Sequence, residues 1–384
     1  MKTYRVTCLT PTLVGDGQKL APVDYMVWRD QVNVLDQNRI FRLLARGPRL
    51  DNYLLQIRRA EKLDFATWGG FAQNFAGRRI AFEDPSLTAV WERTRGEHLF
   101  IPTFAASGSG IFLPGSVLKG AIRSALVLDR AQDSQWAETA QRLASEFAPR
   151  HPGEALEQAV LGGSHNSRMR AVMIADSRPA EANSTRVYLI RVSTLSERGG
   201  RVEGGWKTSP RGTVDFRRVD DSTPYFVEMA SPGTAFEGRW QEPPRFSSAE
   251  MLRALRWKEP LTAAKVLESA NRAAEKMLAQ QKQYAEKVGL ARVGATLNQL
   301  EKRLAEIRTS GTSCLLSLGW GPGLLGKAGY TDPKAEAVRP AFQKLTAFSS
   351  ELRTSLPVPK TRRIVFLKGL PTSLPGWVQL DLFT

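Results

Sequence analysis

Residues 112–123 combine a tight turn, a helix start and two cations, which together could hold a phosphate. Ser116 is expected to cap a helix through its hydroxyl, and the N–H groups of the first turn, which lack intrahelical acceptors, would face the anion. Lys119 and Arg123 are four residues apart, so they share one helix face and could flank the same oxygens. The alternative is an ordinary capped helix with two solvated cations.

A second basic segment extends from Glu197 to Arg218 and contains six cations, three acids and five glycines around Trp206. Cations interleaved with an aromatic ring suit a single nucleic-acid strand, because phosphates attract charge and bases stack on flat faces. The alternative is a flexible, solvated surface loop. The candidate binding residues are Trp206, Lys207, Arg211, Arg217 and Arg218.

A glycine-rich loop, residues 319–330, follows an apolar strand-like run and contains Gly321, Gly323, Gly326 and Lys327. Its spacing imitates a Walker A loop, but Ala328 stands where the magnesium-binding hydroxyl belongs, so ATP binding is not predicted. Such a loop could let an RNA backbone approach closely. The alternative is a plain connection between a strand and a loop.

The overall charge points to the same partner class. Lys and Arg number 54 against 38 Asp and Glu, which gives a formal net charge of +16. This field favours polyanions, and nucleic acid is the leading class. A membrane-surface protein is the competing class, but the sequence shows no long apolar segment and no secretory or lipidation signal. We therefore expect a cytoplasmic protein without membrane contact.

Neither a metal site nor a cofactor is predicted. Cys8 and Cys314 lie in apolar strand-like runs, which favours buried thiols over a disulfide or a metal site. His98, His151 and His165 are isolated from the cysteines at any zinc spacing.

The elements that must position these motifs predict an α+β fold. Apolar alternation and turn residues predict a hairpin over residues 24–35 with Arg29 and Asp30 in its turn, followed by a short helix capped by Asp36. Heptad spacing predicts a helical hairpin around Gly289. The remaining expected elements are a helix over 116–130 and strands over 4–9, 171–176, 185–192, 225–229, 234–238, 313–318, 362–367 and 377–380.

The chain of 384 residues is expected to divide into three parts. Residues 1–245 would form the core, with an insertion at about 45–110 packed on the first sheet and a basic loop at about 197–224. Residues 246–310 would form the helical hairpin. Residues 311–384 would supply the glycine-rich loop and the closing strands of the core.

Several of these stretches resemble the RAMP proteins of CRISPR effector complexes. They are residues 9–17, 22–25 and 113–123 together with the late glycine loop, and the Pro-Gly-Ser-x-Leu-Lys-Gly pattern is a mark of that superfamily. The order of parts and the ending at 375–378 are most similar to the subunit-five family of the type III-A Csm complex. The resemblance spans nearly the whole chain, and it departs from the family at Val117, where a second serine is common.

The resemblance implies a ferredoxin-like, RRM-related core with a guide RNA (crRNA) across its sheet, held by the helix start and by a thumb hairpin at 203–224. It implies an antiviral, non-enzymatic subunit that caps the 3′ end of the crRNA and contacts phosphates without base preference. The implied partners are crRNA, target RNA, the backbone RAMP subunit and the small helical subunit. The RNA-binding residues would be Gly15, Gly17, Gly115, Ser116, Lys119, Arg123, Trp206, Lys207, Arg211, Arg217, Arg218, Gly321, Gly323, Gly326 and Lys327.

Asp24 offers an enzymatic alternative, because it matches the RNA-cleaving aspartate of the repeated backbone subunits. A carboxylate there could support metal-dependent attack on a phosphate, which would make the chain a ribonuclease that trims crRNA or cuts target RNA. The subunit-five pattern is non-cleaving, so we expect a structural role for Asp24. A third class, metal-independent RNA processing, would require His98, His151 or His165 beside the RNA, and His165 is the best candidate of the three.

Overall fold

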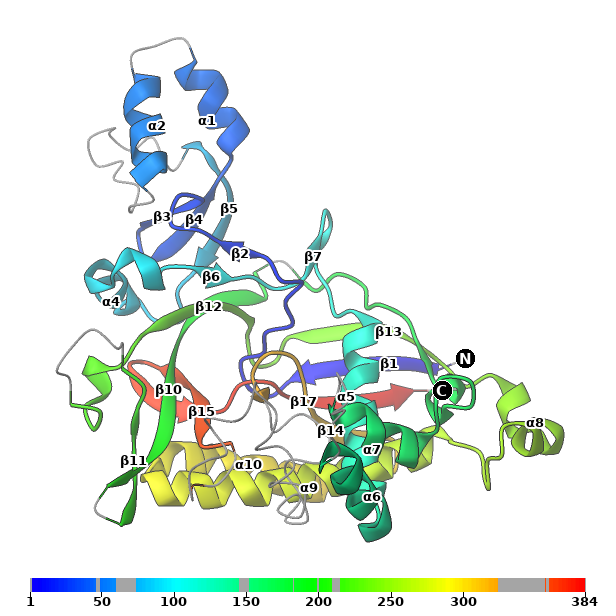
Figure 1. Cartoon of the computed structure of the whole chain (residues 1–384). Coiled ribbons are helices and arrows are strands. Elements are labelled where there is room, and N and C mark those ends of the chain that lie inside the picture. Colours follow the sequence, from blue (N-terminus) through cyan, green and yellow to red (C-terminus); the bar gives the residue numbers. More distant parts are fainter. Residues whose placement is uncertain are drawn as a thin grey trace.

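The predicted α+β fold is confirmed by the computed structural model, which describes residues 2–45, 49–59, 74–144, 152–181, 183–198, 200–208, 215–323, 356 and 359–383. Two five-stranded antiparallel sheets form the body of the molecule, and a smaller lobe rises above them (Figure 1). A long helical hairpin runs beneath both large sheets (Figure 1).

The first sheet is centred on β1 (Lys2–Cys8), near which both chain ends lie (Figure 1). Alternate β1 side chains are buried, as the predicted strand requires, because successive residues of a strand face opposite sides. The sheet order is β14 (Ser313–Ser317), β17 (Trp377–Phe383), β1, β13 (Ala235–Gln241) and β9 (Met173–Ile174). The strand expected over 171–176 is shorter than predicted, because a 3-10 turn, η3 (Arg168–Ala171), occupies its start.

The second sheet is centred on β10 (Thr185–Arg198), which extends six residues beyond the predicted strand. Its length allows β12 (Tyr225–Ala230) and β11 (Arg201–Trp206) to pair one after the other along β10. The sheet is completed by β15 (Thr361–Leu367) and β16 (Leu370–Ser373).

The helical hairpin consists of α9 (Ala263–Val288) and α10 (Ala291–Arg308), within the predicted 246–310 segment. Gly289 ends α9 at a φ of +77°, a left-handed conformation that glycine adopts without steric cost. The predicted heptad side chains of α10 are buried. Arg272 of α9 donates two hydrogen bonds, of 2.8 and 2.7 Å, to the carboxylate of Asp129 on α5 (Gly115–Arg130), which joins the hairpin to α5.

The smaller lobe is built on β3 (Tyr25–Trp28) and β4 (Gln31–Leu35). The predicted turn residues Arg29 and Asp30 both have positive φ, as a type I′ hairpin turn requires. The predicted cap is also present, because Asp36 accepts the Arg39 N–H at the start of α1. The lobe is completed by α1 (Gln37–Leu44), α2 (Arg49–Arg59) and β5 (Ala76–Ala81).

The predicted insertion contacts both large sheets. Phe104 stacks on Phe236 of β13 in the first sheet, with ring centroids 5.4 Å apart. The Glu83 N–H donates to the Val187 carbonyl of β10 in the second sheet. The insertion therefore joins the sheets rather than covering the first one alone.

Short elements complete the described chain. They are β2 (Lys19–Leu20), α4 (Leu87–Arg93), η2 (Gly96–His98), β6 (Ile101–Pro102), β7 (Ala106–Ser107), β8 (Gly110–Ile111), α6 (Asp133–Ala144), α7 (Pro152–Leu161), η4 (Val219–Asp221), η5 (Pro244–Ser247) and α8 (Ala249–Ala254). Across the described ranges, no helix is both long and apolar enough to cross a membrane.

Both cysteines are buried free thiols, as predicted. Burial raises the pKa of Cys8 to about 12, so its thiol stays protonated at neutral pH.

Candidate nucleic-acid interface

The start of α5 differs from the predicted phosphate site. The helix begins at Gly115, with Pro114 rather than Ser116 at its N-cap position, so the prediction that Ser116 caps the helix is wrong. The Gly115 N–H donates a 2.7 Å hydrogen bond to the carboxylate of Asp176. The helix start packs closely on the residues that precede Asp176, because a Cβ at Gly115 would lie 2.5 Å from the carbonyl oxygen of Ile174. A carboxylate of the chain itself therefore occupies part of the anion site.

The two cations of α5 lie on one face, as their spacing predicts. Burial lowers the pKa of Lys119, and the nearby positive charge of Arg123 lowers it further. Arg123 also lies 3.4 Å from the carboxylate of Glu157 on α7. Of the two cations, Lys119 has no ion pair among the described residues.

The first part of the predicted basic loop belongs to the β10–β11 hairpin, and Trp206 at the end of β11 is part of the core. The Trp206 side chain is 8% exposed and packs on Phe366, with ring centroids 5.5 Å apart. The prediction that Trp206 stacks on a base is therefore wrong. The cause is the glycine pair before it: Gly204 lies against Val288 of α9, and Gly205 against the ring of Phe216, with no room for side chains.

The cations of this segment differ in their partners. Arg217 forms a 2.8 Å ion pair with Glu203, and Arg218 lies 3.9 Å from Asp221. Lys207 is exposed, and within the described ranges its ammonium has neither a hydrogen bond nor an ion pair. Arg211 lies outside the described residues.

The glycine-rich loops after β1 and β14 lie side by side. The Trp320 N–H donates to the Leu13 carbonyl at 3.0 Å. A Cβ at Gly319 would overlap that carbonyl, and one at Gly321 would lie 2.5 Å from the carbonyl oxygen of Pro375. These two glycines are therefore needed for packing between loops. Gly15 and Gly17 follow in an exposed turn, whereas Gly326 and Lys327 lie outside the described residues.

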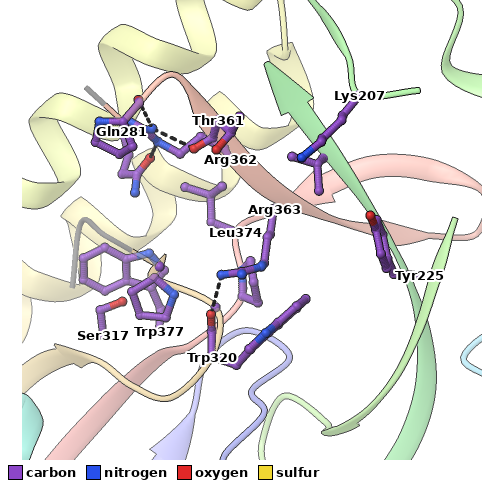
Figure 2. A pocket seen from close by; sticks show the side chains of 16 residues that line it. Lys207, Tyr225, Gln281, Ser317, Trp320, Thr361, Arg362, Arg363, Leu374 and Trp377 are labelled. Atoms are coloured by element: carbon purple, nitrogen blue, oxygen red, sulfur yellow. Dashed lines mark hydrogen bonds between the residues drawn. The ribbon is translucent and has the colours of Figure 1, made fainter. Parts of the chain in front are cut away.

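A cavity of about 330 Å³ opens between these loops and the second sheet (Figure 2). Of the predicted RNA-binding residues, Lys207, Gly321 and Gly323 line it. No acidic side chain lines it in the part of the chain that the structure describes. The complete lining is Val192, Lys207, Tyr225, Gln281, Ser317, Trp320, Gly321, Pro322, Gly323, Pro359, Thr361, Arg362, Arg363, Leu374, Pro375 and Trp377.

Arg363 of β15 extends into the middle of this cavity (Figure 2). Its Nη1 donates a 2.7 Å hydrogen bond to the Trp320 carbonyl, and its guanidinium lies 3.9 Å from the centroid of the Trp320 ring. Burial lowers the pKa of Arg363, because a desolvated cation without a counter-charge is disfavoured. The arrangement leaves a positive charge directed at the cavity.

The neighbouring Arg362 has a structural function. Its Nε donates to the side-chain oxygen of Gln281 at 2.8 Å, and its guanidinium lies 4.3 Å from the ring centroid of Tyr284. Burial lowers its pKa to about 10. Arg362 therefore borders the cavity but anchors β15 to α9, whereas Arg363 extends into the cavity.

Sequence reasoning missed three prominent residues of this site. The Arg362–Arg363 pair at the start of a predicted strand was a usable signal, and Trp320 lies inside the predicted glycine loop without being singled out. Tyr225 gave no signal, because its position in the cavity depends on the pairing of β12 with β10.

The candidate catalytic residues lie away from the cavity lining. Asp24 accepts the Ala21 N–H at 2.7 Å, so its carboxylate holds a local turn. His98 lies 3.4 Å from Glu97, and His165 is in an exposed loop after α7. His151 lies outside the described residues. Within the described ranges, no group of three or more His, Cys, Asp or Glu side chains could hold a metal ion.

The sequence matches the model of the RAMP superfamily over residues 5–287, and the chain belongs to that superfamily. None of the curated proteins compared with it is similar enough to count as a match.

Among solved structures, the chain is similar to a chain of a Csm–crRNA–target RNA ternary complex of a type III-A CRISPR-Cas system. The identity is 20%, the TM-score is 0.67, and the match covers 99% of this chain and 100% of the other. It is also similar to Csm5 of T. onnurineus, with 18% identity, a TM-score of 0.62 and coverage of 97% and 99%. These similarities establish a shared fold.

Proposed function

We propose that this chain is a crRNA-binding subunit of a type III-A CRISPR effector complex and that it caps the 3′ end of the guide, as the subunit-five resemblance implies. The observation that carries the proposal is the end-to-end similarity to Csm5, which covers 97% of this chain and 99% of the other. Such coverage argues for a shared subunit architecture rather than one shared domain.

The charge of the chain supports an RNA partner. A formal net charge of +16 favours a polyanion, and the cavity between the glycine loops and the second sheet contributes Lys207 and Arg363 without an acidic neighbour in its described lining. Contacts with phosphates suit a guide of any sequence, because the RNA backbone is the same for every guide. The proposed partners are crRNA, target RNA, the backbone RAMP subunit and the small helical subunit, and the proposed setting is antiviral defence in the cytoplasm.

We propose further that the subunit performs no chemistry on RNA. The hydrogen bond from Ala21 to Asp24 supports a structural role for this carboxylate. Lys119 is proposed as a peripheral contact, because Arg123 beside it is paired with Glu157.

The test is to express the tagged full-length protein with its neighbouring genes, purify it and sequence the RNA that copurifies. The proposal predicts short RNAs that share a constant 5′ repeat tag followed by variable spacers, together with partner subunits. Deleting this chain should leave complexes whose guides are shorter or poorly protected at the 3′ end.

Two results would contradict the proposal. Copurified RNA without the repeat tag would show that the chain is not part of a guide complex. Guides with unchanged 3′ ends after deletion of the chain would contradict the capping role, although the chain could still be a subunit of the complex.

A further inference from the structure

We infer that the cavity between the glycine loops and the second sheet receives one unstacked nucleotide of the bound RNA. Its phosphate would lie against Lys207 and Arg363, and its base against the rings of Tyr225 and Trp320. The inference rests on the proposed function, since it assumes that the chain binds RNA, and it adds how one unit of that RNA is held.

The size of the cavity limits its occupant. A volume of about 330 Å³ lies at the lower end of the range for small-molecule pockets, roughly 300–1,000 Å³. One base with its sugar suits this space, whereas a duplex does not. RNA-binding proteins commonly hold unstacked single-stranded bases against aromatic side chains and arginine planes.

The charge of the cavity selects an anion. Lys207, Arg362 and Arg363 line it, and no carboxylate does so in the described residues. Arg362 is engaged by Gln281 and by the carbonyl oxygens of Pro359 and Thr361. Lys207 and Arg363 therefore remain as the groups that a phosphate would meet.

Arg363 is held in place before any ligand arrives. Its Nη1 bonds to the Trp320 carbonyl, and one face of the guanidinium covers the Trp320 ring. Among the described residues, the Arg363 guanidinium makes a single hydrogen bond, to the Trp320 carbonyl. Its other N–H groups can therefore donate to a second acceptor. A phosphate there would supply the counter-charge that the burial of Arg363 lacks.

The aromatic residues give the cavity a second kind of contact. Tyr225 and Trp320 are half-buried and line the cavity from different elements, and Figure 2 shows Trp320 next to Arg363 and Tyr225 on a separate strand. Stacking on such rings tolerates any base, because every base has a π-face. The pocket is therefore expected to accept a nucleotide by its position in the guide rather than by its identity.

The experiment uses the assembled complex loaded with guides that carry a single 4-thiouridine, moved one position at a time, followed by irradiation and mapping of crosslinked peptides. One guide position should crosslink to Tyr225 or Trp320, and it should stay the same when the surrounding guide sequence changes. Tyr225→Ala should remove a crosslink at position 225 and weaken one at Trp320, whereas Tyr225→Phe, which retains the ring, should preserve both.

A binding measurement on the full-length protein accompanies the crosslinking. Tyr225→Ala should weaken binding of a labelled single-stranded RNA by about tenfold, the loss expected for one stacked base. Lys207→Ala should weaken it as well, and Lys302→Ala, which changes an exposed lysine of α10, should not. If Tyr225→Ala does not fold, Tyr225→Phe and the two lysine variants keep the test decisive.

The outcomes separate this inference from the proposed function. Complexes that retain guides but crosslink only outside the cavity would overturn the nucleotide pocket and leave the guide-binding role intact. A chain that retains no guide RNA would overturn both. A cavity crosslink whose guide position shifts when the surrounding guide sequence changes would overturn the expectation that the nucleotide is selected by its position.

Discussion

The start of α5 and the cavity beside β15 both combine cations with a tight turn, yet acidic side chains of the described residues contact only the first. Asp176 accepts the Gly115 N–H at α5, and Glu157 pairs with Arg123. In the cavity, Arg363 is aligned by a carbonyl and an aromatic ring, with no acid among the described lining residues. The comparison teaches that basic residues indicate a binding site when the fold leaves their charge uncompensated.

The largest effect is expected from Trp206, which the sequence suggests as a binding residue and the structure places in the core. Trp206→Ala should lower the free energy of unfolding by about 3–5 kcal/mol, because it removes a large buried side chain packed on Phe366. Urea denaturation measures this loss. If the variant instead binds RNA more weakly and its unfolding midpoint is unchanged, Trp206 is an RNA-binding residue rather than a core residue.

The next largest effect is expected in the cavity. Lys207→Glu should weaken RNA binding by about 1–3 kcal/mol, since it removes an uncompensated cation and places a carboxylate near the phosphate. Fluorescence anisotropy with a labelled single-stranded RNA measures the change. Lys302→Glu is the matched control for net charge. Equal losses in the two variants would mean that the overall charge, rather than the cavity, determines affinity.

A smaller effect on stability is expected at α5. Asp176→Ala should cost about 0.5–2 kcal/mol of stability, because it removes the carboxylate that caps the helix start. RNA affinity should stay nearly unchanged. If the variant instead binds RNA much more tightly, Asp176 blocks a phosphate site at α5, and the comparison between the two regions would need to be reversed.

The smallest effect is expected at Asp24. Asp24→Ala should cost about 0.5–1.5 kcal/mol by removing the hydrogen bond from Ala21, whereas Asp24→Asn can retain that bond. Neither variant should alter guide length or target cleavage by the assembled complex, as measured by gel electrophoresis of its RNA. Loss of cleavage in both variants would support the ribonuclease alternative.

Local patterns were sufficient for much of the fold. The turn at Arg29 and Asp30, the cap at Asp36 and the end of α9 at Gly289 each depend on a few neighbouring residues, and all three were predicted correctly. Period-two and heptad spacing likewise located the main strands and the helical hairpin, because side-chain burial follows these periods directly.

The site was less predictable, because its properties depend on residues far apart in the sequence. Asp176 reaches Gly115 across 61 positions. The burial of Trp206 follows from the close approach of α9 at Gly204. Arg363 meets Trp320 only after β15 joins the second sheet and β14 the first. No local pattern indicates such contacts. The strongest sequence motif, residues 112–123, is therefore partly paired with acidic side chains, whereas the cations of the cavity beside β15 are not, within the described ranges.

The most direct test of the central claim is the salt dependence of RNA binding by the full-length protein, Lys207→Gln, and Lys119→Gln with Arg123→Gln. For single strands, each lost phosphate contact lowers the slope of log affinity against log salt by about 0.7. We expect this decrease for Lys207→Gln and a smaller one for the α5 double variant. An unchanged slope for Lys207→Gln with a large decrease for the double variant would contradict the account and make α5 the principal RNA site.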